Sequence, residues 1–152
     1  MATFQTTTTV VVNPEHVVDV LTDPDRIAVW SPIPFELEEF DGDRLRTGSQ
    51  ARVTGKLAGR RLSFDVEIIE AAGNRLALRA TGPVDLDVEY DVEQHNETSE
   101  LRALVSVRSA GGLLGRVISG ATEGLLGAGM LNTAVARIAR EAEARPAPAL
   151  AA

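Results

Sequence analysis

The sequence predicts an α+β fold in which a bent, seven-stranded antiparallel sheet wraps around a long C-terminal helix. Short segments with a hydrophobic period of two alternate with turn residues, which is typical of strands joined as hairpins. A single apolar stripe of helical period runs along the last third of the chain. Because this helix is the only predicted element long enough to cover one face of the sheet, the two should pack together.

One strand and two short helices are predicted at the start of the chain. Thr3–Val12 is rich in threonine and valine and contains no breaker, so it should be a strand. Asn13-Pro14 and Asp23-Pro24 each place a helix-capping residue before a proline that suits the first helical turn. These signals predict short helices over Glu15–Leu21 and from Pro24 to Ala28.

Further strands follow, and the cleanest of them runs from Val84 to Glu93, where apolar residues alternate with acids. The apolar side must be buried, so the acids should form a solvated outer face beside arginines on the neighbouring strands. A flat ladder of acids does not converge on a hard cation, so no metal site is expected. The six strands are expected at Phe35–Phe40, Gln50–Leu57, Arg61–Ala71, Arg75–Thr81, Val84–Glu93 and Glu100–Ser109.

The predicted last helix spans Gly111–Ala144, and glycine interrupts its apolar stripe. On a helical wheel of about 100° per residue, Val117 and Leu131 belong to the same stripe. Gly120 and Gly124 fall near its middle, although each glycine inside a helix costs roughly 1 kcal/mol relative to alanine. The missing side chains therefore leave a gap between Val117 and Leu131.

Two interpretations of this gap are open. The first is close backbone packing, or a helix that begins late, near Gly129. The second is that the gap roofs a ligand cavity, which the low aromatic content of one Trp, one Tyr and four Phe also favours. On the second interpretation, Gly124→Leu should abolish ligand binding and preserve the fold. Leu126 and Met130 fall on the outward arc of this helix.

The whole chain sets wider limits. Its 152 residues suit a single domain over residues 1–144, followed by a Pro/Ala-rich, disordered tail over 145–152. The absence of cysteine excludes disulfides and thiolate metal sites, and suits the cytoplasm. No signal peptide and no membrane-spanning segment is expected. A net charge of −7 argues against binding nucleic acid.

A family resemblance begins in the first helical region. The run VNPEHVVDVLTDPDRIAVW, residues 12–30, resembles the opening of the START-like (SRPBCC) superfamily, whose bacterial members often carry the label polyketide cyclase/dehydrase. The resemblance implies a helix-grip fold over about residues 3–144 and a cavity for a hydrophobic small molecule. The glycine-rich start of the last helix is most similar to proteins like the START-like subunit of carbon monoxide dehydrogenase. The Arg- and Trp-rich cavity of the aromatase/cyclases has no clear match, which puts their dehydrating chemistry in doubt here.

Few residues suggest chemistry in such a cavity. His16 and His95 are expected on the solvated surface, which argues against a Ser-His-Asp arrangement. Tyr90 and Asn132 are weak catalytic candidates as neutral hydrogen-bonding groups. No cofactor is expected. The residues expected to bind a ligand are Trp30, Phe35, Phe64, Val66, Val88, Tyr90, Val117, Gly120, Gly124 and Leu131.

Three functions therefore stay open. The first is a polyketide-cyclase-like protein that acts on a polyketide-type substrate, with apolar binding as its firmest property. The second is a non-catalytic carrier of a hydrophobic metabolite such as a lipid or quinone. The third is a partner-binding module that uses the acidic face of the sheet. A homodimer is compatible with all three.

Overall fold

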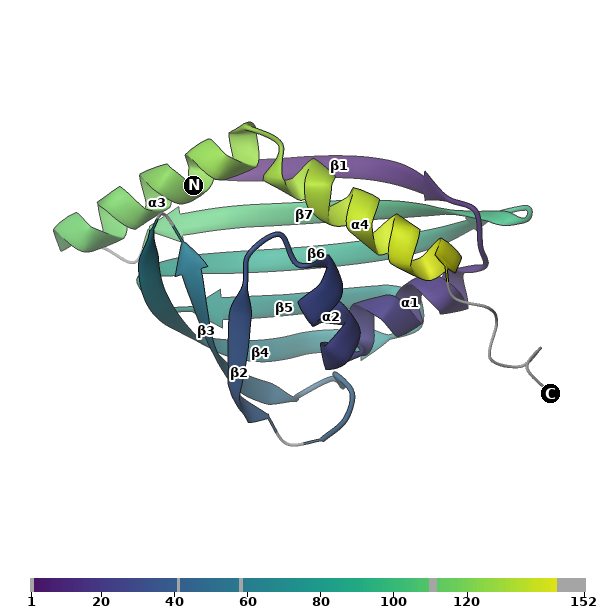
Figure 1. Cartoon of the computed structure of the whole chain (residues 1–152), viewed down its shortest axis with the longest axis horizontal. Coiled ribbons are helices and arrows are strands. Elements are labelled where there is room, and N and C mark those ends of the chain that lie inside the picture. Colours follow the sequence, from purple (N-terminus) through teal and green to yellow (C-terminus); the bar gives the residue numbers. More distant parts are fainter. Residues whose placement is uncertain (1, 41, 58, 110–111, 145–152) are drawn as a thin grey trace.

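The seven strands form one antiparallel sheet in the order β1-β7-β6-β5-β4-β3-β2, as Figure 1 shows. The computed structural model describes residues 2–40, 42–57, 59–109 and 112–144. This sheet and the helices that follow β1 and β7 confirm the predicted α+β helix-grip fold. The strands are β1 (Ala2–Val10), β2 (Phe35–Phe40), β3 (Gln50–Leu57), β4 (Arg60–Ala72), β5 (Arg75–Thr81), β6 (Val84–His95) and β7 (Thr98–Ser109).

The sheet bends because two of its strands contain irregularities. The register shifts between Ile68 and Glu70 of β4 and between Leu37 and Glu39 of β2. An extra residue in one strand kinks it and increases its local twist. The β2–β4 side therefore curls toward the helices, and the sheet acquires a concave face.

Two short helices, α1 (Pro14–Thr22) and α2 (Pro24–Trp30), follow β1 as predicted. Both begin with proline, and the Asp23 side chain caps α2 by accepting a hydrogen bond of 3.0 Å from the Asp25 backbone N–H. α1 packs against α4 and against strands β5 to β7. Its side chains Val17, Val20 and Leu21 are fully buried.

The last third of the chain is two helices rather than the single predicted helix. α3 (Gly112–Gly127) and α4 (Met130–Ala144) are separated at Ala128 and Gly129, as Figure 1 shows; Gly111 lies outside the described residues. Gly129 has φ of +105°, a conformation that residues with a side chain rarely adopt. Its carbonyl accepts a hydrogen bond of 3.0 Å from the Thr133 backbone N–H and so begins α4.

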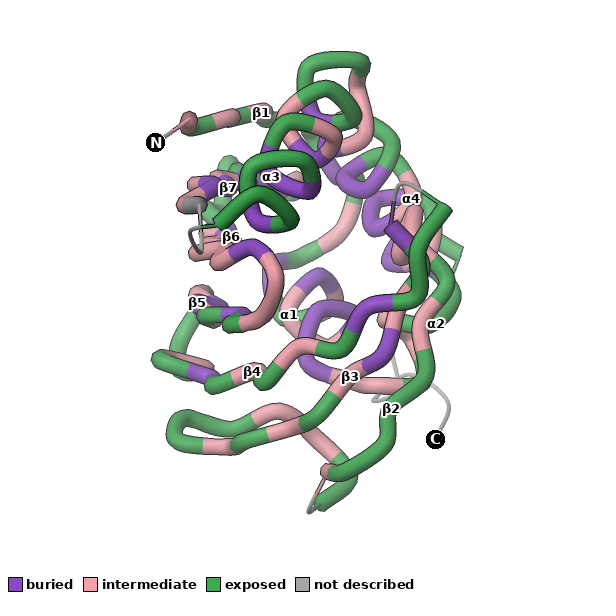
Figure 2. The backbone as a smooth tube through the Cα atoms, turned by 90° about the vertical axis from the view of Figure 1, so that its left-hand side faces the viewer, coloured by how far each residue is buried: buried purple, intermediate pink, exposed green. Residues whose placement is uncertain are grey.

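The break also changes which face of α3 is buried. Figure 2 shows the buried residues of α3 toward the sheet and the exposed ones on its outer side. The predicted apolar stripe lies mostly outside, with Leu113 81% and Val117 54% exposed. The stripe was predicted from a continuous wheel, whereas the backbone turns at Gly129 before α4 begins. The buried residues of α3 are Gly115, Ile118, Ser119, Thr122 and Leu126.

α4 lies along β1 and α1, and its own stripe is buried as predicted. Leu131, Val135 and Ile138 are each at most 6% exposed. Two polar contacts fasten α4 to α2 and the loop after it. Arg26 forms an ion pair of 2.6 Å with Glu141, and the Arg137 guanidinium donates to the Ser31 carbonyl at 3.1 Å.

Across the described ranges, none of the helices combines the length and apolarity needed to cross a bilayer. The predicted disordered tail, residues 145–152, lies outside those ranges.

Candidate functional site

A cavity of about 270 Å³, here called the first cavity, lies between the concave face of the sheet and the helices. Strands β5, β6 and β7 form one wall. The end of α2, the loop after it, the end of α3 and the start of α4 form the other. Its lining is Ile27, Trp30, Ser31, Pro32, Ile33, Leu57, Leu76, Leu78, Leu86, Val88, Tyr90, Val105, Thr122, Leu126, Met130, Leu131 and Ala134.

The sheet wall is apolar and incompletely covered. Leu86 and Val88 occupy the inward phase of β6, opposite the acids of the outer face. Both side chains, and Leu78 of β5, are nevertheless only half-buried, because the space in front of them is unfilled. Protein interiors normally pack as densely as organic crystals, so an unfilled apolar space of this size is a candidate ligand site.

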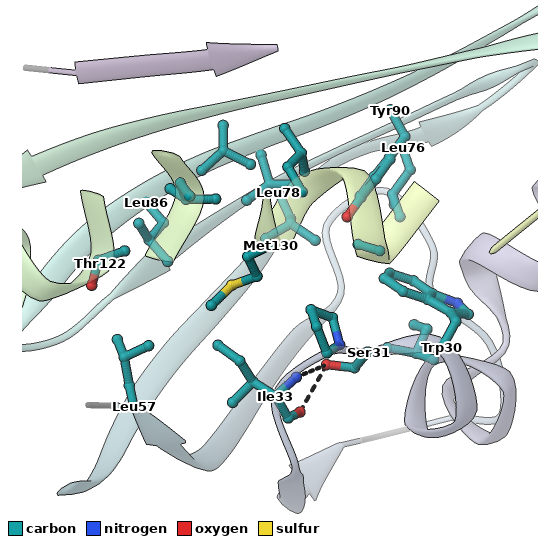
Figure 3. Close-up of a pocket in the computed structure, with 17 residues that line it drawn as sticks. Trp30, Ser31, Ile33, Leu57, Leu76, Leu78, Leu86, Tyr90, Thr122 and Met130 are labelled. Atoms are coloured by element: carbon teal, nitrogen blue, oxygen red, sulfur yellow. Dashed lines mark hydrogen bonds between the residues drawn. The ribbon is translucent and has the colours of Figure 1, made fainter. Parts of the chain in front are cut away.

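Two aromatic residues meet at one end of the first cavity. Trp30, the last residue of α2, donates from its indole Nε1 to the Val20 carbonyl at 3.1 Å. Its ring packs edge-to-face against Tyr90, with 5.9 Å between centroids and an angle of 77°. The indole is thereby fixed from both sides, and Figure 3 shows Trp30 and Tyr90 approaching from opposite walls.

The Tyr90 hydroxyl has no hydrogen-bond partner among the described residues. Figure 3 shows this oxygen directed away from the sheet, into the interior. Burial disfavours the charged phenolate and raises the pKa of Tyr90 above its ordinary value of 10.0. At neutral pH the residue is therefore a hydrogen-bond donor rather than a base, and it could donate to a ligand carbonyl.

The other polar side chains of the first cavity are already engaged. The Thr122 hydroxyl donates to the Ile118 carbonyl at 2.7 Å within α3. The Ser31 hydroxyl donates to the Ile33 carbonyl at 2.8 Å and accepts from the Ile33 backbone N–H at 3.3 Å (Figure 3). Among the described lining residues, Tyr90 is thus the one side chain with hydrogen-bonding capacity to spare.

A second cavity, of about 300 Å³, adjoins the first on the β2–β4 side of the sheet. Its walls come from β2, β3 and β4 and from the start of α2. Its lining is Pro24, Ile27, Ser31, Ile33, Phe35, Leu37, Phe40, Leu45, Ala51, Val53, Gly55, Phe64, Val66, Ile68, Leu78, Ala80 and Leu86.

Seven of the ten residues expected to bind a ligand line one of these cavities. Trp30, Val88, Tyr90 and Leu131 line the first cavity. The other three, Phe35, Phe64 and Val66, line the second. Their contact with a ligand stays a prediction.

The remaining three expectations need correction. Val117, Gly120 and Gly124 lie on the exposed side of α3, and a Cβ added at either glycine would meet nothing within 4 Å. They cannot roof a cavity, because that side of the helix faces solvent. For the same reason Gly124→Leu should not block ligand binding. Asn132 is also exposed and accepts a hydrogen bond from the Thr6 hydroxyl, which ties α4 to β1 outside both cavities.

Sequence reasoning missed part of the helical wall. Leu126 and Met130 were expected to face outward, yet both line the first cavity, and Leu126 is only 9% exposed. The glycines at positions 127 and 129, on either side of the break, were the signal that the wheel should not be continued across it. Ile33 was also missed, because the prolines around it exclude the regular periodicity from which inward positions are inferred.

The two histidines stay outside both cavities. His95 is exposed at the end of β6, 3.9 Å from Glu93. His16 is half-buried on α1 rather than fully solvated, and its Nδ1 is buried without a partner. Glu93, His95 and Glu100 hold ligand atoms within 4.8 Å of one another, but this cluster lies at the surface, away from the cavities.

The acids of β6 form the expected outer ladder with arginines. Arg75 contacts Glu89 at 2.6 Å, Glu70 at 2.9 Å and Asp91 at 3.1 Å. Arg79 contacts Asp87 at 2.9 Å. Because the negative charges are largely paired within the sheet, this face offers a basic partner little unmatched charge.

The chain resembles known proteins over nearly its whole length. A family profile described as "Polyketide cyclase / dehydrase and lipid transport" matches residues 1–143. No functionally curated protein matches the chain significantly in sequence.

Solved structures repeat the fold at low sequence identity. The Zhui aromatase/cyclase from Streptomyces sp. R1128 is 21% identical, with a TM-score of 0.72 and coverage of 97% of both chains. A protein from Chromobacterium violaceum is 15% identical, with a TM-score of 0.71 over 94% of this chain and 98% of that one. A START superfamily protein from Mycobacterium smegmatis is 15% identical, with a TM-score of 0.65 over 91% of this chain and 97% of that one.

Proposed function

The chain belongs to the polyketide cyclase/dehydrase and lipid-transport family, and from this premise we propose that it binds a small, uncharged, apolar molecule in the first cavity. The membership bears out the START-like resemblance of residues 12–30. The observation that carries the proposal is the unfilled apolar space with one unpaired, buried hydroxyl, that of Tyr90. Burying a charged ligand there would be costly, because no described lining residue carries an opposite charge.

A matched pair of variants on α4 tests this function. Ala134 lines the first cavity and is 3% exposed, whereas Ala136 is exposed on the same helix. Ala134→Phe should fill the cavity and Ala136→Phe should not. We expect the wild type and Ala136→Phe to take up uncharged N-phenyl-1-naphthylamine saturably, at one probe per chain, with energy transfer from Trp30. Ala134→Phe, or Ala134→Leu if the larger side chain prevents folding, should lose this uptake. Equal uptake by the folded variants would contradict the proposal.

Cyclase-like catalysis is the second candidate, and the position of Tyr90 favours it. In an aldol cyclisation, a carbon between two carbonyls attacks a third carbonyl, whose oxygen becomes negative. The Tyr90 hydroxyl would stabilise that oxygen by hydrogen bonding, and the apolar walls would fold the chain into a reactive shape. Removal of the proton from the attacking carbon would fall to water, because no other described lining residue is ionisable.

The two candidates differ in turnover. A catalyst should convert a poly-β-ketone thioester into a cyclised product faster than the buffer does, and Tyr90→Phe should slow this conversion. A carrier should return the compound unchanged. Product analysis by mass spectrometry and ultraviolet absorbance separates these outcomes.

A further inference from the structure

The two cavities are neighbours that share a wall made only of side chains. Ile27, Ser31 and Ile33 on the helix side, and Leu78 and Leu86 on the sheet side, line both of them. Figure 3 shows Ile33 approaching from the loop and Leu78 and Leu86 from the sheet. Between the cavities, therefore, only these side chains stand in the way of a bound molecule.

This partition can be opened without unfolding anything. Ile33, Leu78 and Leu86 are all half-buried, and their aliphatic side chains make no hydrogen bonds. Incompletely packed side chains of this kind change rotamer on fast timescales. The backbone behind Ile33 is fixed, because the Ser31 carbonyl is held by Arg137 at 3.1 Å. Movement of side chains on a fixed frame would join the cavities while leaving the fold intact.

Size also favours joining them. Each cavity alone, at about 270 and 300 Å³, lies at the lower limit of ligand pockets, which run from about 300 to 1,000 Å³. Together they fall well inside that range. The joined space would be elongated, because Tyr90 lies four residues along β6 from Leu86. At about 3.3 Å per residue, their Cα atoms are roughly 13 Å apart.

The two ends differ in chemistry. The first cavity contains the unpaired Tyr90 hydroxyl. The second is lined by apolar side chains, apart from Gly55 and the already bonded Ser31. A ligand suited to both would carry its hydrogen-bond acceptor at one end and an apolar tail at the other.

We propose that the ligand is an elongated, uncharged molecule whose carbonyl end lies beside Tyr90 and whose apolar tail passes Ile33 into the second cavity. This rests on the proposed function and adds a second subsite to it. The tail subsite is formed by β2, β3 and β4, with Val66 near its middle strand.

A series of unbranched methyl ketones of increasing chain length tests the second subsite, with displacement of N-phenyl-1-naphthylamine as the readout. Each methylene that enters an apolar site should tighten binding about fourfold, which corresponds to ~0.8 kcal/mol. In the wild type this gain should continue to chain lengths that exceed the first cavity. Val66→Phe, which places a ring in the second cavity, should end the gain at a shorter chain. Ala51→Leu, on the neighbouring strand β3, serves if Val66→Phe does not fold.

Ile69→Phe is the matched control, because Ile69 is 46% exposed on the same strand and lines neither cavity. It should keep the wild-type dependence on chain length. If the gain ended at the same length in the wild type and in Val66→Phe, the second subsite would be overturned while the proposed function stood. If no ketone of any length displaced the probe, both would be overturned.

Discussion

Tyr90 carries the one ionisable group among the described residues that line either cavity. Its hydroxyl is buried, has no partner among those residues and stays protonated, because burial disfavours the phenolate. These properties suit donation to a neutral acceptor and exclude general-base catalysis by Tyr90 at neutral pH. Titration, alkaline stability and ligand choice each test them.

The first prediction concerns titration of the folded protein. Tyr90 is the only tyrosine in the chain, so phenolate absorbance reports this residue without interference. Below the pH at which the fold is lost, the absorbance should stay that of neutral tyrosine through pH 10, the ordinary pKa of the group. The denatured chain should titrate near that ordinary value. Native titration at the same pH as the denatured chain would contradict the burial of this hydroxyl.

The second prediction concerns stability at alkaline pH. Because the folded pKa of Tyr90 is raised, the unfolded chain releases its proton first, and the free energy of unfolding falls above about pH 10. The slope should reach up to about 1.4 kcal/mol per pH unit. Tyr90→Phe should lack this component, which denaturant unfolding at several pH values measures. Lys56 is the only lysine and is exposed, so few other groups titrate there.

The third prediction concerns ligand choice. Tyr90→Phe removes the donor and keeps the ring against Trp30, so apolar uptake should persist. Binding of a methyl ketone should weaken about two- to tenfold, the effect of losing one net hydrogen bond. Binding of the alkene of the same length should hardly change. Equal losses for ketone and alkene, measured by probe displacement, would mean that the hydroxyl makes no contact with the ligand.

At the scale of elements, the break between α3 and α4 decides which residues reach the cavity. A straight helix would turn the stripe of Val117 inward, whereas the turn at Gly129 brings Leu126 and Met130 to the first cavity. The same break leaves Gly120 and Gly124 facing solvent. Glycines in one short segment therefore have different roles.

Alanine substitutions separate those roles. Gly129→Ala should destabilise the fold by about 1–2 kcal/mol, because Gly129 occupies a positive φ of 105°. Gly124→Ala should stabilise it by about 0.5–1 kcal/mol, because position 124 is helical and its Cβ would meet nothing within 4 Å. Denaturant unfolding of both variants measures this. Destabilisation by Gly124→Ala would place that face of α3 against another surface.

The sequence predicted elements well wherever a local signal existed. Gln50–Leu57 and Arg75–Thr81 have the expected bounds, because turn residues on both sides define them. The Asn13-Pro14 and Asp23-Pro24 signals found both short helices. The continuity of the last helix was wrong because a helical wheel assumes an unbroken axis, and periodicity does not report a change of direction.

At the scale of the whole molecule, the cavities arise from how little of the concave face α4 covers. α4 packs on β1 and α1, so the middle strands face α2 and the loop around Ile33 instead. Those short segments carry few large side chains, and the space remains open. Seven of the expected ligand-binding residues lie on its walls, because inward phase on a strand is readable from sequence. The residues contributed by the loop and by the α3–α4 junction were not readable, because tertiary geometry alone places them.

The most direct test of ligand binding is native mass spectrometry of the protein purified from its own host, followed by denaturing extraction. We expect one uncharged, elongated apolar molecule per chain in the wild type and in Ala136→Phe, and none in Ala134→Phe. Either of two results would contradict the account. One is a charged molecule, or any molecule that Ala134→Phe retains at the wild-type ratio. The other is an empty wild-type protein that also takes up no apolar probe.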